Sequence, residues 1–276
     1  MKATFVFLIE RVRALVSTST IIAMGISILL LLVMLFILFF MLKRKFEMKG
    51  VPIFIGAFCF IIFAMILEQR LHVFVLKPTA SGSIALINNH PWLYVLYGVF
   101  AAGIFEETAR FVGFHLLKGQ YPTVDTSFAY GFGHGGIEVI LVGVLSLVNS
   151  LILALLLQDP NGALANELPQ AVLQNFQNTS AGAIYLSVIE RFGAFVVQLC
   201  LSFFVWLAVN RKHKKFFFPV AILLHAIVDT PAAMTQAGLL SSISIVYLLL
   251  FLMAILLVGT SVKLYRKEIQ EGDLSN

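Results

Sequence analysis

Residues 20–42 read TIIAMGISILLLLVMLFILFFML and are followed directly by Lys43, Arg44 and Lys45. This apolar run is long enough for an α-helix to cross the hydrocarbon core of a bilayer, which takes about 20 residues. The remainder of the chain is similar: 60% of its 276 residues are hydrophobic, 12% are charged, and the mean hydropathy is +0.96. Soluble domains are roughly half apolar and about a quarter charged. The sequence therefore predicts an all-α, polytopic transmembrane helical bundle.

Short polar or basic segments divide the chain into seven predicted spans. Their approximate bounds are 20–42, 51–67, 91–117, 126–157, 181–209, 216–234 and 241–262. We expect residues 68–76, which mix apolar and polar side chains, to leave the membrane after the second span. Residues 1–18 are mildly amphipathic and are expected to form an interfacial segment. No internal repeat is evident, so residues 1–276 are interpreted as a single integral membrane domain.

Basic residues are distributed unevenly between the two sides that seven spans would create. Twelve Lys and Arg lie in the segments 43–49, 118, 211–215 and 263–267, whereas five lie on the other side: Lys2, Arg11, Arg13, Arg70 and Lys77. The positive-inside rule then places the N-terminus outside and the C-terminus in the cytoplasm. The net charge of +5 is explained by topology, and no nucleic acid is expected as a partner.

Ionisable residues inside the spans are the most informative feature, because each costs about 2.5–3.5 kcal/mol at the centre of a membrane helix on insertion scales. They are Glu106, Glu107, Arg110 and His115 in the third span, His134 and Glu138 in the fourth, Glu190 and Arg191 in the fifth, and His225 and Asp229 in the sixth. His115 is expected at the polar rim. Glu190 and Arg191 are consecutive and point in different directions on a helix, so either could pair with another span.

Three pairs of these residues are four positions apart: Glu106–Arg110, His134–Glu138 and His225–Asp229. This spacing places the members of a pair on one face of a helix. At a rise of 1.5 Å per residue, the first residue of each pair lies about 12–17 Å from the predicted cytoplasmic end of its span. We therefore expect the three pairs to meet at one site in the cytoplasmic half of the bilayer.

The chemistry of this set suits the activation of water. Glu106 could act as a general base with His134 sharing the water, a second histidine could stabilise an oxyanion, and Arg110 could hold Glu106 by a charge-assisted bond. A zinc ion is the alternative, with candidate ligands His134, Glu138, His225 and Asp229, although the HExxH pattern is absent. The glycines on both sides of His134 allow either tight helix packing or local opening of the helix.

Four segments carry a resemblance to a known family. EETARFVGF at 106–114, YGFGHGGIEVI at 130–140, IERFGAF at 189–195 and HAIVD at 225–229 resemble the YhfC family of intramembrane peptidases. That family is placed within the CAAX-processing and bacteriocin-processing (CPBP/ABI) superfamily. The likeness covers residues from about 51 to 262, and the ordered set is more specific than EExxR alone.

The resemblance implies hydrolysis of a peptide bond within or near the membrane. By this likeness Glu106 and His134 would activate water, and His225 with Asp229 would form the oxyanion-binding side. Glu107 and Arg110 would support them.

Two positions depart from the superfamily pattern. Tyr130 stands where phenylalanine is frequent, and Asp229 stands where the CAAX-processing branch commonly has asparagine. An ionised aspartate cannot donate a hydrogen bond to an oxyanion. Asp229 would therefore be protonated, orient His225 or bind a metal, and the additional carboxylate of Glu138 strengthens the metal option.

The resulting interpretation is an intramembrane endopeptidase with its catalytic core at about 91–234, in a bacterial plasma membrane. Its partners would be the lipid bilayer and a membrane-embedded or membrane-associated peptide substrate, and one zinc ion is a possible cofactor. Two other hypotheses remain open. Buried Glu, His and Asp side chains also serve proton-coupled transporters, and a non-catalytic membrane scaffold or immunity-type protein could carry the same residues.

Overall fold

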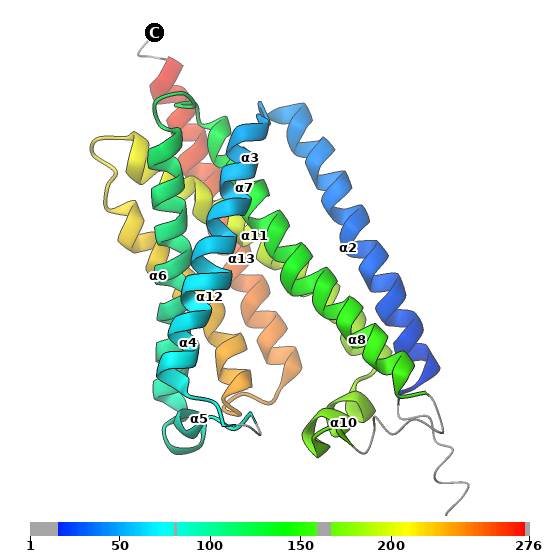
Figure 1. Cartoon of the computed structure of the whole chain (residues 1–276). Helices are drawn as coiled ribbons and strands as arrows, with labels where there is room; N and C mark the ends of the chain where they lie inside the picture. Colours follow the sequence, from blue (N-terminus) through cyan, green and yellow to red (C-terminus); the bar gives the residue numbers. More distant parts are fainter. Residues whose placement is uncertain (1–15, 80–81, 159–166, 274–276) are drawn as a thin grey trace, which may run out of the picture. The chain divides into compact units, whose positions relative to one another are not determined.

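A computed structural model describes residues 16–79, 82–158 and 167–273 (Figure 1). Within these ranges the chain is helical and contains no strand. The elements are α2 (Thr18–Lys45), α3 (Gly50–Phe60), η1 (Ile61–Glu68), α4 (Gln69–Leu76), α5 (Ala85–Asn89), α6 (Pro91–Leu117), α7 (Asp125–Glu138), η2 (Val139–Val144), α8 (Leu145–Leu156), α10 (Gln170–Asn178), α11 (Ala181–Asn210), α12 (Phe217–Gln236) and α13 (Ile243–Asp273). The predicted all-α class is confirmed, whereas most of the expected interfacial segment 1–18 lies outside the described residues.

Six helices in the described part of the chain are long and apolar enough to cross a membrane. They are Thr18–Lys45, Gly50–Leu76, Asp125–Leu156, Ala181–Asn210, Phe217–Gln236 and Ile243–Gln270. The predicted third span is α6, which has the expected bounds and 27 residues but carries three charged residues in its second half, so its composition is less apolar. A multi-pass membrane protein is thus established. The number of seven spans and their orientation stay predictions.

The second span extends further than its expected end at residue 67. The helix continues without interruption through the π-helical segment η1 and through α4 to Leu76, and it ends at Lys77, whose φ of 44° is left-handed. The last helix is also longer than predicted and runs to Asp273. Near the C-terminal end of this helix, Glu268 accepts hydrogen bonds from Arg211 and Lys214, which lie in the segment between α11 and α12.

The chain divides into two compact units. One comprises Met1–Ile37 and Val139–Phe192, and the other comprises Leu38–Glu138 and Gly193–Asn276. In the first unit Thr20 Oγ1 donates to the carbonyl of Thr179 at 3.1 Å, which ties the start of α2 to the end of α10. That residues 1–276 fold as a single domain stays a prediction.

Glycines allow the closest helix approach in the second unit, where α3 lies beside α7 (Figure 1). A Cβ atom added to Gly133 would overlap the backbone of Ile53, and one added to Gly56 would overlap the carbonyl of Tyr130. Small residues permit such contact between membrane helices. Because α7 stays helical from Asp125 to Glu138, the structure favours the packing role of the glycines around His134 over local opening.

Burial differs strongly between the helices of the second unit. The second half of α11 is almost entirely enclosed and supplies Leu201, Phe203, Val205 and Trp206 to the apolar core. In contrast, α13 exposes a row of large apolar side chains: Leu248, Phe251, Leu252, Ile255 and Leu256. In a bilayer such a surface contacts lipid, as expected for a last span without interior charges.

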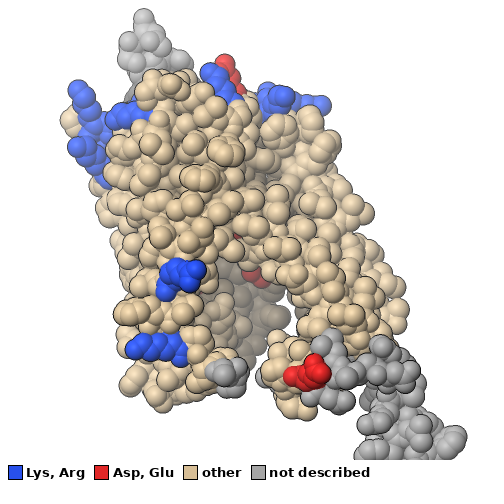
Figure 2. All heavy atoms as spheres, in the orientation of Figure 1, with Lys and Arg blue, Asp and Glu red and all other residues tan. Residues whose placement is uncertain are grey.

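The basic loops meet at one end of the second unit. Lys118 Nζ donates to the carbonyl of Val209 at 2.7 Å, and Lys214 Nζ lies 2.7 Å from Glu268 Oε2 near the end of α13. Figure 2 shows the blue side chains gathered at this end, with fewer elsewhere on the visible face. The loops therefore share an end as the charge pattern predicts, and the side of the membrane that this end faces stays a prediction.

Candidate active site

Glu106 of α6 lies at the centre of a buried polar cluster in the second unit. His134 Nε2 of α7 is 3.0 Å from its Oε2 atom, and His225 Nε2 of α12 is 3.9 Å from its Oε1 atom. Arg110 Nη2, one turn along α6, is 3.6 Å from Oε2. Gln198 Nε2 of α11 donates to the same oxygen at 3.0 Å. Four helices therefore place polar groups around one carboxylate.

Glu107 connects the second histidine to the arginine. Its Oε1 atom lies 2.5 Å from Arg110 Nη1 and 2.6 Å from His225 Nδ1. On its other side the His225 ring places Nε2 3.3 Å from Asp229 Oδ2. His225 is thus held between two carboxylates, and its Nε2 atom is directed to the edge of the site that Glu106 occupies.

Gln198 is the site residue that sequence reasoning missed. Besides bonding to Glu106, its amide accepts a bond from Arg110 and donates to Glu138. Because Gln198 is uncharged, a search for ionisable residues in the spans passes over it. The available signal was a lone amide in the apolar run GAFVVQLCL at 193–201. Gly135 permits this approach, since a Cβ atom there would lie 2.9 Å from the Cβ of Gln198.

The structure brings together the three predicted pairs, with differences in their contacts. Glu106–Arg110 and His225–Asp229 contact each other directly. Glu138 is on the same helix as His134 but reaches the cluster through Gln198. Arg110 was expected to hold Glu106, and its closer carboxylate contact is with Glu107. A guanidinium has five donors, so one arginine can serve both carboxylates.

Three other predicted residues take no part in these contacts. His115 is exposed, with Nδ1 2.8 Å from the carbonyl of Phe111, and its position at the polar rim of the membrane stays a prediction. Glu190 and Arg191 belong to the first unit and contact one another, with Arg191 Nη2 2.6 Å from Glu190 Oε1.

Burial gives the cluster a closed and an open side. Glu107, Arg110 and His134 are completely buried, and 11% of the Glu106 side chain is exposed. Asp229 is the open edge, with 41% of its side chain exposed. This arrangement provides a carboxylate and a histidine within reach of one water, in surroundings that strengthen electrostatic interactions.

The closed side is also tightly packed. The ring of Phe60 meets the ring of His134 edge to face at 5.0 Å between centroids, and the Tyr130 ring is 6.0 Å away. Tyr130 donates its hydroxyl to the carbonyl of Ala109 at 3.0 Å. Tyr130 therefore uses a hydroxyl that phenylalanine would lack to connect α7 to α6.

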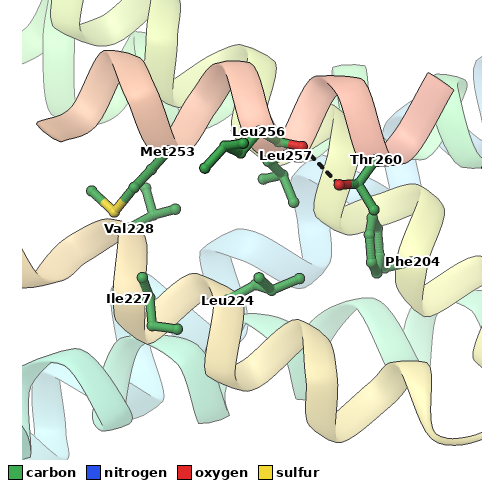
Figure 3. Close-up of a pocket in the computed structure, with 8 residues that line it drawn as sticks. All are labelled: Phe204, Leu224, Ile227, Val228, Met253, Leu256, Leu257 and Thr260. Carbon is green, nitrogen blue, oxygen red and sulfur yellow. Dashed lines mark hydrogen bonds between the residues drawn. The ribbon is translucent and has the colours of Figure 1, made fainter. Parts of the chain in front are cut away.

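A cavity of about 170 Å³ elsewhere in the second unit has a different character. It lies between α11, α12 and α13, and its lining consists of Phe204, Leu224, Ile227, Val228, Met253, Leu256, Leu257 and Thr260 (Figure 3). The hydroxyl of Thr260 donates to the carbonyl of Leu256 at 2.8 Å. None of these lining residues is ionisable, so the cavity offers no hydrolytic chemistry and is distinct from the cluster around Glu106.

Known proteins similar to this chain show its family. A family model described as "YhfC intramembrane metalloprotease" matches residues 26–250. The chain belongs to the YhfC family. A similar protein is the "Uncharacterized membrane protein YhfC" of Bacillus subtilis (strain 168), which is 34% identical over 230 residues, covering 81% of this chain and 88% of that protein. No solved structure matches the chain. All residues around Glu106 lie in the part that the YhfC model matches.

The description of the family as a metalloprotease implies a bound metal ion. Among the described residues, no three His, Cys, Asp or Glu side chains are already grouped so that they could hold an ion. The donor types nevertheless fit zinc. His134 and His225 both direct their Nε2 atoms toward the Glu106 carboxylate, and Asp229 Oδ2 lies 3.3 Å from His225 Nε2. Glu107 at His225 Nδ1 is the kind of outer partner that orients metal-binding histidines. Of the four candidate ligands, Glu138 is bonded to Gln198, and His134, His225 and Asp229 are the residues that would hold zinc.

Proposed function

We propose that this protein is an intramembrane endopeptidase that hydrolyses a peptide bond of a membrane-embedded or membrane-associated peptide. The observation that carries the proposal is the 3.0 Å contact between Glu106 Oε2 and His134 Nε2 in a buried cluster with one open edge. The family description agrees with proteolysis. The likeness of the EExxR, His134 and His225-xxx-Asp229 pattern to the CPBP/ABI superfamily is part of this proposal.

The water-activating side consists of Glu106 and His134. Glu106 accepts a proton from a water that His134 helps to position, and it later returns a proton to the leaving nitrogen. Arg110 and Gln198 donate to the Glu106 carboxylate and restrict its movement. A fixed base lowers the entropy cost of reaching the attacking geometry.

The oxyanion side consists of His225 with its two carboxylates. Because Glu107 and Asp229 lie against different ring nitrogens, an imidazolium at this position can donate from both. The single Nε2–H group lies 3.3 Å from Asp229 Oδ2 and 3.9 Å from Glu106 Oε1. It would turn from Asp229 to the developing oxyanion when the substrate carbonyl binds beside Glu106, and this donation stabilises the transition state. Asp229 orients His225 in this scheme and donates nothing itself.

Zinc held by His134, His225 and Asp229 would supply Lewis-acid polarisation of the water and of the scissile carbonyl. Glu106 would keep its place as the base in that case, since its carboxylate lies against both histidines.

The test uses the full chain in detergent micelles with a mixed library of single-span transmembrane peptides, and products are identified by mass spectrometry. Wild type is expected to produce defined internal cuts. Glu106→Gln and His134→Ala should produce none, whereas Glu47→Gln should match wild type because 68% of the Glu47 side chain is exposed. Full activity of either site variant would sink the proposal. Ion-dependent uptake that Glu106→Gln abolishes, without any cleavage by wild type, would favour a transporter instead.

A further inference from the structure

The apolar cavity between α11, α12 and α13 has a buried wall and an exposed rim. Phe204 of α11 is buried and belongs to the wall, whereas Ile227 of α12 and Leu256 of α13 are 53% and 70% exposed. Leu256 is also a member of the row of large apolar side chains that α13 exposes. The cavity is therefore reached from a surface that contacts lipid when the protein lies in a bilayer.

The lining of the cavity suits an alkyl chain better than a peptide main chain. Of the eight lining side chains, that of Thr260 carries the polar group, and its hydroxyl already donates to the carbonyl of Leu256 at 2.8 Å. A main chain that entered would bring N–H and C=O groups that need partners inside a membrane. An apolar cavity of about 150 Å³ stays free of water and binds a six-carbon benzene ring. A volume of about 170 Å³ therefore holds a comparable stretch of an acyl chain.

A cation follows the cavity along α13. Lys263 is exposed and comes three residues after Thr260, which places both on one face of the helix, with the lysine about 4.5 Å farther along the axis. From Lys263 the helix continues to Glu268, whose Oε2 atom is 2.7 Å from Lys214 Nζ at the basic end of the unit. Figure 3 shows Met253 and Thr260 at opposite ends of the cavity. The Thr260 end is therefore directed to the basic loops and the Met253 end away from them.

We propose that this cavity binds one acyl chain of an anionic phospholipid, whose phosphate is bound by Lys263. The acyl chain enters from the bilayer and supplies the dispersion contacts that an empty space between α12 and α13 lacks. The phosphate then lies beyond Thr260, where a lysine near the membrane surface raises the affinity for an anionic lipid about five-fold. This order of polar head and apolar tail matches the orientation of a phospholipid whose head group lies at the basic end. The inference uses none of the residues around Glu106 and does not depend on the proposed peptidase function.

The experiment measures lipid binding to the full chain in detergent micelles. The probes are phosphatidylglycerol and phosphatidylcholine with identical acyl chains, so that they differ in head-group charge alone. Titration followed by native mass spectrometry gives the number of lipids bound per chain and the Kd of each lipid. We expect one phosphatidylglycerol to bind per chain, about five-fold or more tightly than phosphatidylcholine. Equal affinity for the two lipids would overturn the proposal.

Two pairs of variants locate the bound lipid. Lys263→Gln should weaken phosphatidylglycerol binding about five-fold, whereas Lys43→Gln should not, because Lys43 is exposed on α2, which contributes no lining residue. Met253→Trp places an indole in the cavity and should abolish binding of both lipids. Leu252→Trp is its matched control, since Leu252 is the exposed neighbour on the same helix and lies outside the lining. Equal affinities within either pair would overturn the proposal, and the exposed position of Lys263 keeps it testable if Met253→Trp fails to fold.

Two other occupants of the cavity would give different results. A second copy of the chain would produce a dimer in light scattering that Met253→Trp converts to a monomer. A transmembrane peptide from the library would displace phosphatidylglycerol from wild type when the two are mixed. Either result would assign the cavity to protein and overturn the lipid site. A monomer that retains phosphatidylglycerol in the presence of the peptides is the result that the proposal requires.

Discussion

Gln198 Nε2 donates to Glu106 Oε2 at 3.0 Å, while the Oε1 atom of the same amide accepts from Arg110. An amide is the side chain that can fill both positions, because it has a donor and an acceptor at its end. Carboxylates on α6 and α7 are thereby joined through one residue of α11, since Gln198 also donates to Glu138. The position of the proposed base depends on a neutral side chain.

Gln198→Glu should therefore reduce activity strongly with little change in size. The new carboxylate still accepts from Arg110 but faces Glu106 and Glu138 without a proton to donate. Hydrogen bonds to charged groups contribute about 1.5–3 kcal/mol, so kcat should fall about 10- to 100-fold with KM unchanged. The measurement is steady-state cleavage of a library peptide. Gln236→Glu on exposed α12 surface is the control, and equal rates for the two variants would contradict the role of Gln198.

Metal content tests the zinc ligands separately from activity. In the zinc-dependent form of the mechanism, protein purified without chelator should contain about one zinc per chain, measured by mass spectrometry. His134→Ala and His225→Ala should both lose it, because each removes a nitrogen that faces the common site. His115→Ala should retain it, since that side chain is exposed and bonds to Phe111. Zinc that persists in both site variants, or is absent from wild type, would refute the proposed ligand set and favour water activated by Glu106 alone.

Arg110 is expected to stabilise the folded protein in addition to its place in the site. It is completely buried and bonds to Glu107, Gln198 and Ser202. Arg110→Met would break the buried ion pair with Glu107 and leave His225 as the remaining partner of that carboxylate. Breaking a buried pair costs about 3–5 kcal/mol. Unfolding of the protein in detergent, followed by circular dichroism, measures this loss.

Two further variants make the stability measurement specific. Arg70→Met at an exposed position of α4 should change the free energy of unfolding little. The double variant Glu107→Gln, Arg110→Met should recover part of the loss, because the carboxylate that lost its partner is neutralised. No recovery in the double variant would show that the penalty comes from packing and not from the buried charge.

The sequence predicts the membrane helices and the meeting of the site residues because both follow from simple costs. Ionisable side chains in a span must face protein, and spacing of four residues fixes the face. Glu106, His134 and His225 were found in this way. Gln198 was not found because an amide is uncharged, and the search considered only the ionisable residues that are costly to insert into a membrane.

The burial of Glu68 was missed for another reason. The mixed composition of residues 68–76 favours a segment outside the membrane. The composition of the preceding residues, Ile61–Glu68, does not predict that they form a π-helix. The wider turns of η1 depend on how the backbone accommodates neighbouring helices. Likewise, the exposure of Asp229 depends on where α12 stands against α6, which periodicity on one helix cannot specify.

The close contact of α3 with α7 leads to a last prediction. A Cβ atom at Gly133 would overlap the carbonyl of Ile53, so Gly133→Ala must push α3 away from the helix that carries His134. Overpacking of this kind costs typically about 1–3 kcal/mol. Gly25→Ala is the matched control, because open space surrounds that helical position and alanine favours helix over glycine by about 1 kcal/mol. Unfolding measurements should therefore move in opposite directions for the two variants. A stabilising effect of Gly133→Ala would show that α3 and α7 are not held together at this distance, and the placement of His134 beside Glu106 would lose its structural support.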